Sequence, residues 1–215
     1  MGIQERKRRE RERRKQQIMV AAKRVFAKKG YGRTTMGRIA KEAELSAGTL
    51  YLYFKSKSEL WAALSIRVLQ YLLMRLDHLI AHQDSDVNGN ISELKAVLLD
   101  AYEFDPTIFR NLFNIQSSDW LMDIKPELIE EIESLGQQSL NKIASIFQQG
   151  INRGIFLHRH PKAIADIVWS MFTGVVLWEG SNPSGEQGAQ HLQNTMETAF
   201  EIFEKGILVS NRPST

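Results

Sequence analysis

Hydrophobic residues recur along most of the chain at intervals of three or four positions, the spacing that places them on one face of an α-helix. A first stripe at residues 18–26 stops at a cationic turn followed by Gly30, which is typical of a helix end. A longer stripe at residues 60–79 follows Ser56 and Glu59, whose spacing predicts a capping box at a helix start. The remaining stripes and breakers extend the pattern to about nine helices, and so predict an all-α protein.

One segment departs from this pattern. TLYLYF at residues 49–54 favours a β-strand by residue propensity, because Thr, Tyr and Phe are common in extended chains. No neighbouring segment could pair with it, and a lone strand is not stable. On a helix capped by Ser46, Leu50 and Phe54 would share one buried face. We therefore predict a short helix over residues 46–54.

A second short helix, capped by Thr34 or Thr35, is expected just before this one. Two short helices joined at an angle form a helix-turn-helix, whose second helix enters the major groove of DNA. Ala47 and Gly48 leave little bulk where that helix must approach the groove closely. Thr49 can donate to a base edge or a phosphate. Flanking hydroxyls and cations are placed to bind phosphates, and these are Thr35, Arg38, Tyr51, Tyr53, Lys55 and Lys57.

Many residues in this region stand in a recognisable order and spacing. They are Phe26, Gly30-Tyr31, Thr34-Thr35-Met36, Ile39-Ala40, Ala43, Ser46, Gly48-Thr49-Leu50-Tyr51, Tyr53-Phe54, Ser56-Lys57 and Leu60. Through them, residues 18–60 resemble the DNA-binding domain of TetR-family transcriptional regulators. The resemblance implies an all-α homodimer that represses transcription at an inverted-repeat operator. It also implies a C-terminal domain that binds a small-molecule effector and then releases DNA.

By position, the resemblance assigns base contacts to one set of residues and phosphate contacts to another. The base-reading set is Ala47, Gly48, Thr49, Tyr51 and Leu52. Of the phosphate-binding residues named above, Thr35, Tyr53 and Lys57 fall at family contact positions. Gly37 lies where some members contact DNA through a long side chain, so that contact cannot be made here.

Charge is distributed unevenly along the chain. Residues 1–60 hold 17 Lys or Arg and six Glu, a net charge of +11, so the remainder carries −8 of the total of +3. A basic N-terminal segment in an otherwise acidic chain indicates that this segment binds a polyanion. The simpler alternative is that the basic residues form a solvated helical face. Eight of the ten residues 6–15 are Lys or Arg. This basic run either continues the first helix and adds sequence-independent affinity for DNA, or forms a disordered tail.

Several other classes of function are disfavoured. The chain has no cysteine, which excludes disulfides and thiolate metal sites. His78 and His82 have metal-ligand spacing but no recognisable third ligand. No catalytic or phosphate-binding motif is present, so we expect neither an enzyme nor a cofactor. The apolar run at residues 167–178 is too short to span a bilayer, and no export signal is recognisable, so we expect a cytoplasmic protein without membrane contact.

The expected organisation is an arm and three-helix DNA-binding domain at residues 1–57, followed by a larger helical domain at 58–210. Helices at residues 161–179 and 190–208 are expected to pair with a second copy, with a single-chain core as the alternative. Aromatic residues in the larger domain suit a hydrophobic or amphipathic effector, or form plain core. The candidate pocket residues are Phe104, Phe109, Phe113, Asn114, Gln116, Trp120, Trp169 and Thr173.

Two further classes of function stay open at this point. One is a protein that coats nucleic acid without sequence preference through its basic run, but such a protein would not need the shape predicted for residues 46–54. The other is an all-α ligand-binding protein that no longer recognises an operator. Departures from the family pattern at Gly37, Ala47 and Leu52 favour that alternative.

Overall fold

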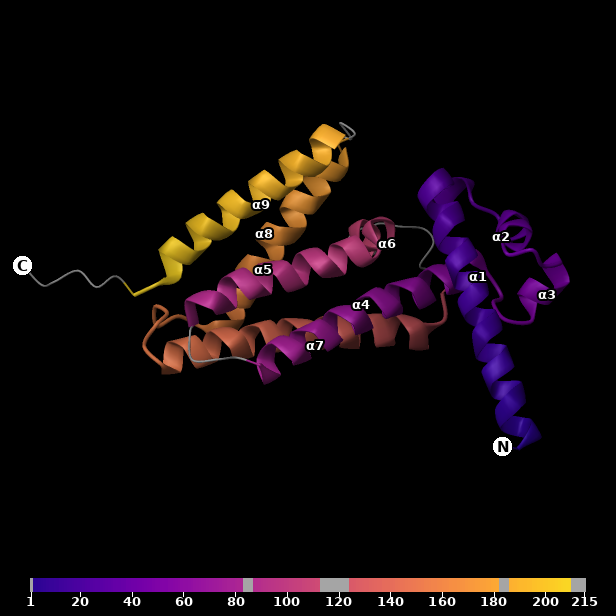
Figure 1. Ribbon diagram of the computed structural model, residues 1–215, viewed down its shortest axis with the longest axis horizontal. Coiled ribbons are helices and arrows are strands. Elements are labelled where there is room, and N and C mark those ends of the chain that lie inside the picture. The colour runs from indigo at the N-terminus through magenta and orange to yellow at the C-terminus, as the bar shows by residue number, and fades with distance from the viewer. Residues whose placement is uncertain (1, 83–86, 113–123, 182–185, 210–215) are drawn as a thin grey trace, which may run out of the picture. The chain divides into compact units, whose positions relative to one another are not determined.

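The computed structural model describes residues 2–82, 87–112, 124–181 and 186–209. These residues form nine α-helices, which confirms the prediction of an all-α protein (Figure 1). The helices are α1 (Ile3–Arg33), α2 (Met36–Glu42), α3 (Ala47–Tyr51), α4 (Lys57–Ala81), α5 (Val87–Phe104), α6 (Pro106–Leu112), α7 (Pro126–Asn152), α8 (Pro161–Ser181) and α9 (Glu186–Ile207).

The chain divides into two compact units. The first contains Met1–Arg67 and Asn114–Ile132, and thus α1, α2, α3 and the beginning of α4. The second contains Val68–Phe113 and Glu133–Thr215, and thus the rest of α4, the helices α5, α6, α8 and α9, and most of α7. The apolar stripe predicted at residues 60–79 is buried along α4, so this helix contributes to the core of both units.

An aromatic cluster holds the first unit together. Phe26 and Tyr31, near the end of α1, meet the ring of Trp61 edge-on at centroid distances of 4.8 and 5.2 Å. The Tyr31 hydroxyl also lies 2.7 Å from the Ser58 hydroxyl in the first turn of α4. Phe26 and Trp61 are fully buried. The cluster therefore fixes the end of α1 against the start of α4.

In the second unit, aromatic rings join helices that are distant in sequence. Phe109 of α6 packs edge-on against Phe172 of α8 at 5.7 Å. Phe147 of α7 lies 5.9 Å from Phe203 of α9. Helix α8 packs along α9, and the chain between α7 and α8 pairs with the end of α9, where the Leu157 amide donates to the Ile207 carbonyl at 2.8 Å.

Helix boundaries differ from expectation at two places. α9 begins at Glu186, before the predicted start at residue 190, and includes Gly188. A glycine costs only about 1 kcal/mol inside a helix, and burial of the apolar face outweighs that cost. α3 ends at Tyr51, whereas the sequence predicted a helix to residue 54. Leu52 and Tyr53 instead form a turn, in which their amides donate to carbonyls three residues back.

Candidate DNA interface

The entry to the helix-turn-helix is shaped by Gly30. Its φ of +71° ends the regular part of α1, in a region that favours glycine. The Thr34 hydroxyl then donates to the Gly30 carbonyl at 2.7 Å. Thr35 caps α2, because its hydroxyl accepts from the Arg38 amide at 3.3 Å. Of the two capping residues that the sequence allowed, the structure selects Thr35.

The turn between α2 and α3 is a Schellman motif. The Leu45 amide donates to the Ala40 carbonyl at 2.9 Å, and the Glu44 amide donates to the Lys41 carbonyl at 3.1 Å. Glu44 holds the left-handed position of the motif with φ +55°, a position that usually carries glycine or asparagine. The sequence does not predict the left-handed conformation at Glu44, because glutamate has no preference for it.

Helix α3 has the buried side and the exposed side that the sequence predicted. The Ser46 hydroxyl accepts from the Thr49 amide at 3.1 Å and so caps the helix. Leu50 and Phe54 are buried beneath it. The opposite surface is open: Ala47 and Gly48 are exposed, Tyr51 is 45% exposed and Leu52 is 71% exposed. Two large apolar side chains in solvent, one at the end of α3 and one directly after it, mark a surface suited to a partner.

The structure brings the five predicted base-reading residues together on and just after α3. The space around Gly48 is open, since a Cβ added there would meet only the Ser46 hydroxyl at 3.9 Å. The Thr49 hydroxyl lies 2.9 Å from the Ser46 hydroxyl, which orients it while leaving a lone pair or proton for another group. Base contact by these residues stays a prediction.

The predicted phosphate-binding cations are held by backbone carbonyls. The Lys57 ammonium donates to the Tyr31 carbonyl at 3.2 Å and lies 4.4 Å from the centre of the Tyr31 ring. The Lys55 ammonium donates to the Tyr51 carbonyl at 3.1 Å. An ammonium has three donors, so each lysine keeps donors for a phosphate while its position is fixed.

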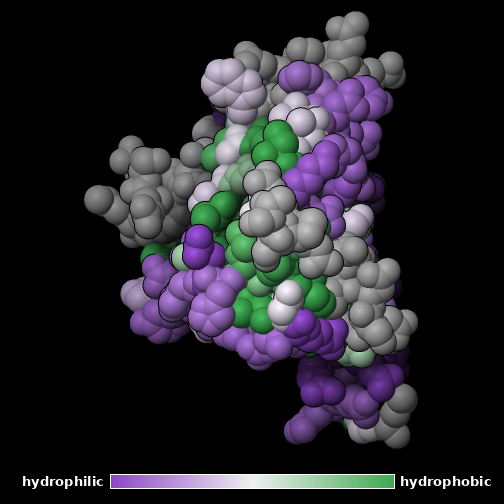
Figure 2. All heavy atoms as spheres, turned by 90° about the vertical axis from the view of Figure 1, so that its left-hand side faces the viewer, coloured by the Kyte–Doolittle hydropathy of each residue, from purple (hydrophilic) through white to green (hydrophobic). Residues whose placement is uncertain are grey.

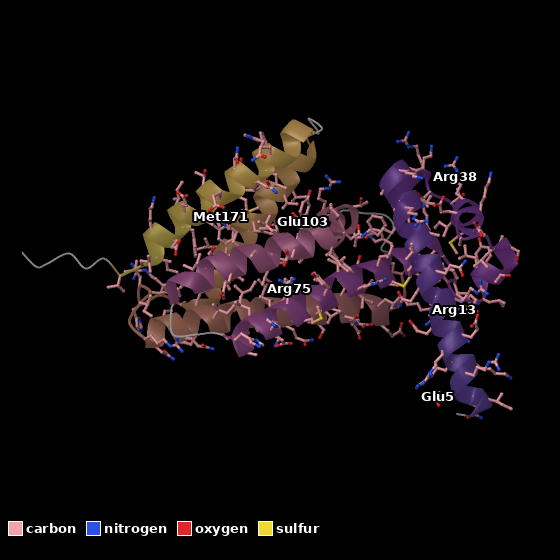
Figure 3. The ribbon with its side chains drawn as sticks, in the orientation of Figure 1. Glu5, Arg13, Arg38, Arg75, Glu103 and Met171 are labelled. Carbon is pink, nitrogen blue, oxygen red and sulfur yellow. The ribbon has the colours of Figure 1, made fainter. Side chains whose placement is uncertain are left out.

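Three further members of the predicted phosphate-binding set also lie around the motif. Arg38 is exposed on α2, and its guanidinium donates to the Arg33 carbonyl (Figure 3). Thr35 is exposed at the start of the same helix. The ring of Tyr53 is half-buried, and the Arg11 guanidinium lies 5.8 Å from its centre.

The start of α4 carries the predicted capping box in a modified form. The Ser56 hydroxyl accepts from the Glu59 amide at 3.1 Å, as expected. The Glu59 carboxylate accepts from the Lys55 amide at 2.5 Å, one residue before the position that the usual box would engage. It also pairs with Lys125 at 3.2 Å. These bonds fix the first turn of α4 beside the turn that follows α3.

The predicted effector pocket is described only in part. Phe113, Asn114, Gln116 and Trp120 lie outside the described residues. Phe109 is fully buried, with its ring centre 6.3 Å from that of Trp169. Thr173, one turn beyond Trp169 on α8, is buried and donates to the Ser170 carbonyl. Phe104 instead stacks on Tyr71 at 4.4 Å.

In the described parts of the chain, no three His, Asp or Glu residues lie close enough together to hold a metal ion. His78 and His82 stack on each other at 4.1 Å. None of the helices there is both long and apolar enough to cross a membrane.

Comparison with known proteins extends this picture. The family model for bacterial regulatory proteins of the tetR family matches residues 18–64. The uncharacterized HTH-type transcriptional regulator YfiR of Bacillus subtilis (strain 168) is 28% identical over 168 residues, which cover 77% of this chain and 79% of YfiR. The fatty acid degradation regulator FadR from Bacillus halodurans has the same fold, with a TM-score of 0.72 at 19% identity over 90% of this chain and 95% of FadR.

A second solved structure also shares the fold. FadR from Bacillus subtilis in complex with stearoyl-CoA gives a TM-score of 0.69 at 20% identity, covering 89% of this chain and 98% of that one. The helix-turn-helix, the matched segment and the shared fold define a DNA-binding transcriptional regulator. Residues 18–64 match the tetR family of bacterial regulatory proteins, and the comparisons support a regulator of that family.

Proposed function

We propose that the protein is a repressor that binds an inverted-repeat operator as a homodimer and is released by a hydrophobic or amphipathic small molecule. The observation that carries the proposal is the exposed side of α3, where small residues precede Tyr51 and Leu52 in solvent. A recognition helix must approach base edges closely with its first turns, and Ala47 and Gly48 permit that approach. The caps and the carbonyl-held lysines described above keep this surface in place.

A homodimer is supported by apolar side chains that α8 and α9 leave in solvent. Ile167 is 57% exposed and Trp178 is 70% exposed on α8, while Ile202 is 67% exposed on α9. On the face that carries the C-terminal end of α9, hydrophobic residues gather in an area bordered by hydrophilic ones (Figure 2). Since large exposed apolar residues on adjoining helices usually mark an interface, and two half-sites require two copies, we assign the exposed face of α8 and α9 that carries Ile167, Trp178 and Ile202 to the partner subunit.

Charged substitutions on this face should therefore separate the dimer. Replacing both isoleucines, as Ile167→Glu with Ile202→Glu, is expected to give a monomer in analytical ultracentrifugation. Its affinity for the full inverted repeat should fall at least tenfold, because the second half-site no longer adds binding energy through the linked subunit. Met74→Glu is the matched control, since Met74 is an apolar residue 55% exposed on α4. A double variant that stays dimeric while the control behaves as wild type would contradict the assignment.

The effector proposal relies on apolar and aromatic side chains around α6 and α8. Phe109, Phe172 and Trp169 form a connected group of rings, a lining suited to an apolar ligand or the apolar part of an amphipathic one. The B. subtilis FadR structure, in complex with stearoyl-CoA, supports an amphipathic molecule of this kind as one candidate.

Tryptophan emission offers a direct test of the effector. We expect stearoyl-CoA, or another member of a panel of aliphatic and aromatic compounds, to change the emission of the protein and to release it from operator DNA. The emission change should be lost in Trp169→Phe and kept in Trp61→Phe, because Trp61 belongs to the aromatic cluster of the first unit. A response that survives Trp169→Phe would show that Trp169 does not report the ligand.

A further inference from the structure

Helix α1 is much longer than the segment that matches the family model. It begins at Ile3, fifteen residues before the match starts at residue 18. We refer to residues 3–17 of α1 as the basic arm; it contains the basic run, and it is helical rather than irregular. With a rise of 1.5 Å per residue the arm is roughly 21 Å long. Its turns run out beyond α2 and α3 (Figure 1).

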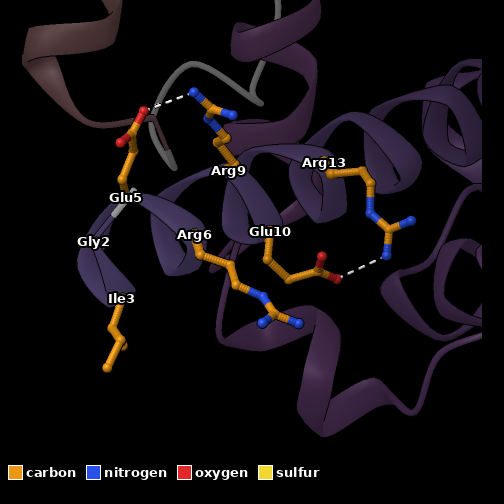
Figure 4. Close-up of a pocket in the computed structure, with 7 residues that line it drawn as sticks. All are labelled: Gly2, Ile3, Glu5, Arg6, Arg9, Glu10 and Arg13. Atoms are coloured by element: carbon orange, nitrogen blue, oxygen red, sulfur yellow. Dashed lines mark hydrogen bonds and ion pairs between the residues drawn. The ribbon is translucent and has the colours of Figure 1, made fainter.

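Two acids of the arm are paired with arginines of the same helix. Glu5 pairs with Arg9 at 2.7 Å, and Glu10 pairs with Arg13 at 2.9 Å (Figure 4). The hydrogen bond from Arg13 and its charge lower the pKa of the Glu10 carboxyl, so the pair stays ionised. In both pairs the acid precedes the base by three or four residues, the order that favours a helix.

All residues around the hollow in Figure 4 belong to residues 2–13 of one chain segment, so it is open surface rather than a ligand site.

One side of the arm carries four cations, and the third acid, Glu12, borders this side and accepts from the Gln16 side chain at 3.1 Å. On a helix of 3.6 residues per turn, Lys7, Arg8 and Lys15 share a side with Arg11. Within the described chain, the side chains of Lys7, Arg8 and Lys15 have no ion-pair or hydrogen-bond partner. Arg6, Arg9 and Arg13 lie on the other side, with Glu10. We call these the Arg11 side and the Glu10 side.

The Arg11 side lies toward the helix-turn-helix. Arg11 lies over the ring of Tyr53, which directly follows the recognition helix α3 and its exposed Leu52. The base of the arm is tied to the same motif, since the Gln17 side-chain amide donates to the Ala43 carbonyl in the turn at 2.9 Å. Gln16, on the Glu10 side, accepts from Arg67 of α4 at 2.9 Å. The arm is therefore oriented by contacts on two sides rather than attached as a free tail.

We propose that the Arg11 side of the basic arm binds the phosphates of duplex DNA that flanks each operator half-site. The inference rests on the proposed function, because it continues the surface that α3 presents to the operator. A length of 21 Å corresponds to about six base pairs at 3.4 Å per step. An anionic membrane is the less suitable partner: residues 4–17 contain no apolar side chain, and a membrane-surface helix needs an apolar face.

Two variants of equal charge test this inference. One carries Lys7→Gln, Arg8→Gln and Lys15→Gln on the Arg11 side, and the matched control carries Arg6→Gln, Arg9→Gln and Arg13→Gln on the Glu10 side. Affinity for a labelled duplex is measured by fluorescence anisotropy over a range of KCl concentrations. Each lost phosphate contact should flatten the slope of log K against log salt by about 0.9. The magnitude of this slope should thus fall by about 2 to 3 per half-site in the first variant. In the control it should fall by less than about 1.

The length of the duplex supplies an independent readout. Extending the operator by six base pairs on each side should raise the affinity of the wild type and of the control variant at least tenfold, and leave the first variant unchanged. Equal slopes for the two variants, no effect of extension, or loss of binding to phosphatidylglycerol vesicles with unchanged DNA slopes would each overturn the inference. The ratio of the affinities for operator and for random duplex tests the proposed function separately, since we assign the preference for operator sequence to α3. Both variants should keep the helix content and melting temperature of the wild type.

Discussion

Gly48→Leu is expected to abolish most sequence-specific DNA binding while leaving the protein at least as stable as the wild type. A Cβ added at this position would meet no neighbour closer than the Ser46 hydroxyl at 3.9 Å, and the position is exposed, so we expect the fold to accept the side chain. Leucine is also favoured over glycine in a helix by somewhat under 1 kcal/mol. Against DNA the same side chain would hold the first turn of α3 away from the base edges. Since each good base contact contributes about 1 to 3 kcal/mol, affinity should fall about a hundredfold or more.

Gly136→Leu is the matched control for this experiment. Gly136 lies inside α7 with no atom near its would-be Cβ, so the gain in helix propensity is the same. This variant should bind the operator as the wild type does. Affinity is measured by anisotropy and stability by thermal unfolding monitored by circular dichroism. Undiminished specific binding by Gly48→Leu would show that α3 does not approach the groove at this residue.

Gly150→Ala is expected to destabilise the second unit severely. An added Cβ would lie 2.1 and 2.2 Å from two ring carbons of Phe156, which is fully buried. The ring cannot move easily, because the adjacent backbone is held to the end of α9 through Leu157 and Ile207. Overpacking of this kind usually costs about 1 to 3 kcal/mol and occasionally more, and we expect the upper end of that range.

Gly136→Ala again provides a control in the same helix, where space is open. It should stabilise the protein by up to about 1 kcal/mol through helix propensity. Urea unfolding of the two variants gives both values. Adding Phe156→Leu to Gly150→Ala should recover part of the loss, and a double-mutant cycle measures that coupling. A Gly150→Ala variant as stable as the wild type would mean that α7 and the segment after it pack differently from the structure.

Local signals in the sequence predicted most of the DNA-binding unit. Gly30 ends the regular part of α1, and Ser46 caps α3, because glycine and serine have backbone and side-chain preferences that act over a few residues. Leu50 and Phe54 are buried as predicted by helical spacing. The strand propensity of TLYLYF was correctly set aside, since a strand without a partner cannot satisfy its backbone.

Features that depend on tertiary contact were not predictable. α3 ends early at Tyr51, and the Lys55 amide shortly after it donates to the Glu59 carboxylate, a contact that helical periodicity does not reveal. The left-handed Glu44 carries no local signal. The contact of Arg11 with Tyr53 joins residues far apart in sequence, and helical periodicity alone does not reveal which side of a helix another segment covers.

Selection of bound duplexes from a random DNA library at physiological salt, followed by sequencing, tests the central claim most directly. We expect enrichment of an inverted repeat whose half-sites lie about one helical turn or more apart, as a two-fold dimer with one recognition helix per copy requires. The wild type should yield this repeat, and Gly48→Leu should not. Binding without enrichment of any sequence would contradict operator recognition and indicate a protein that coats DNA through its basic residues.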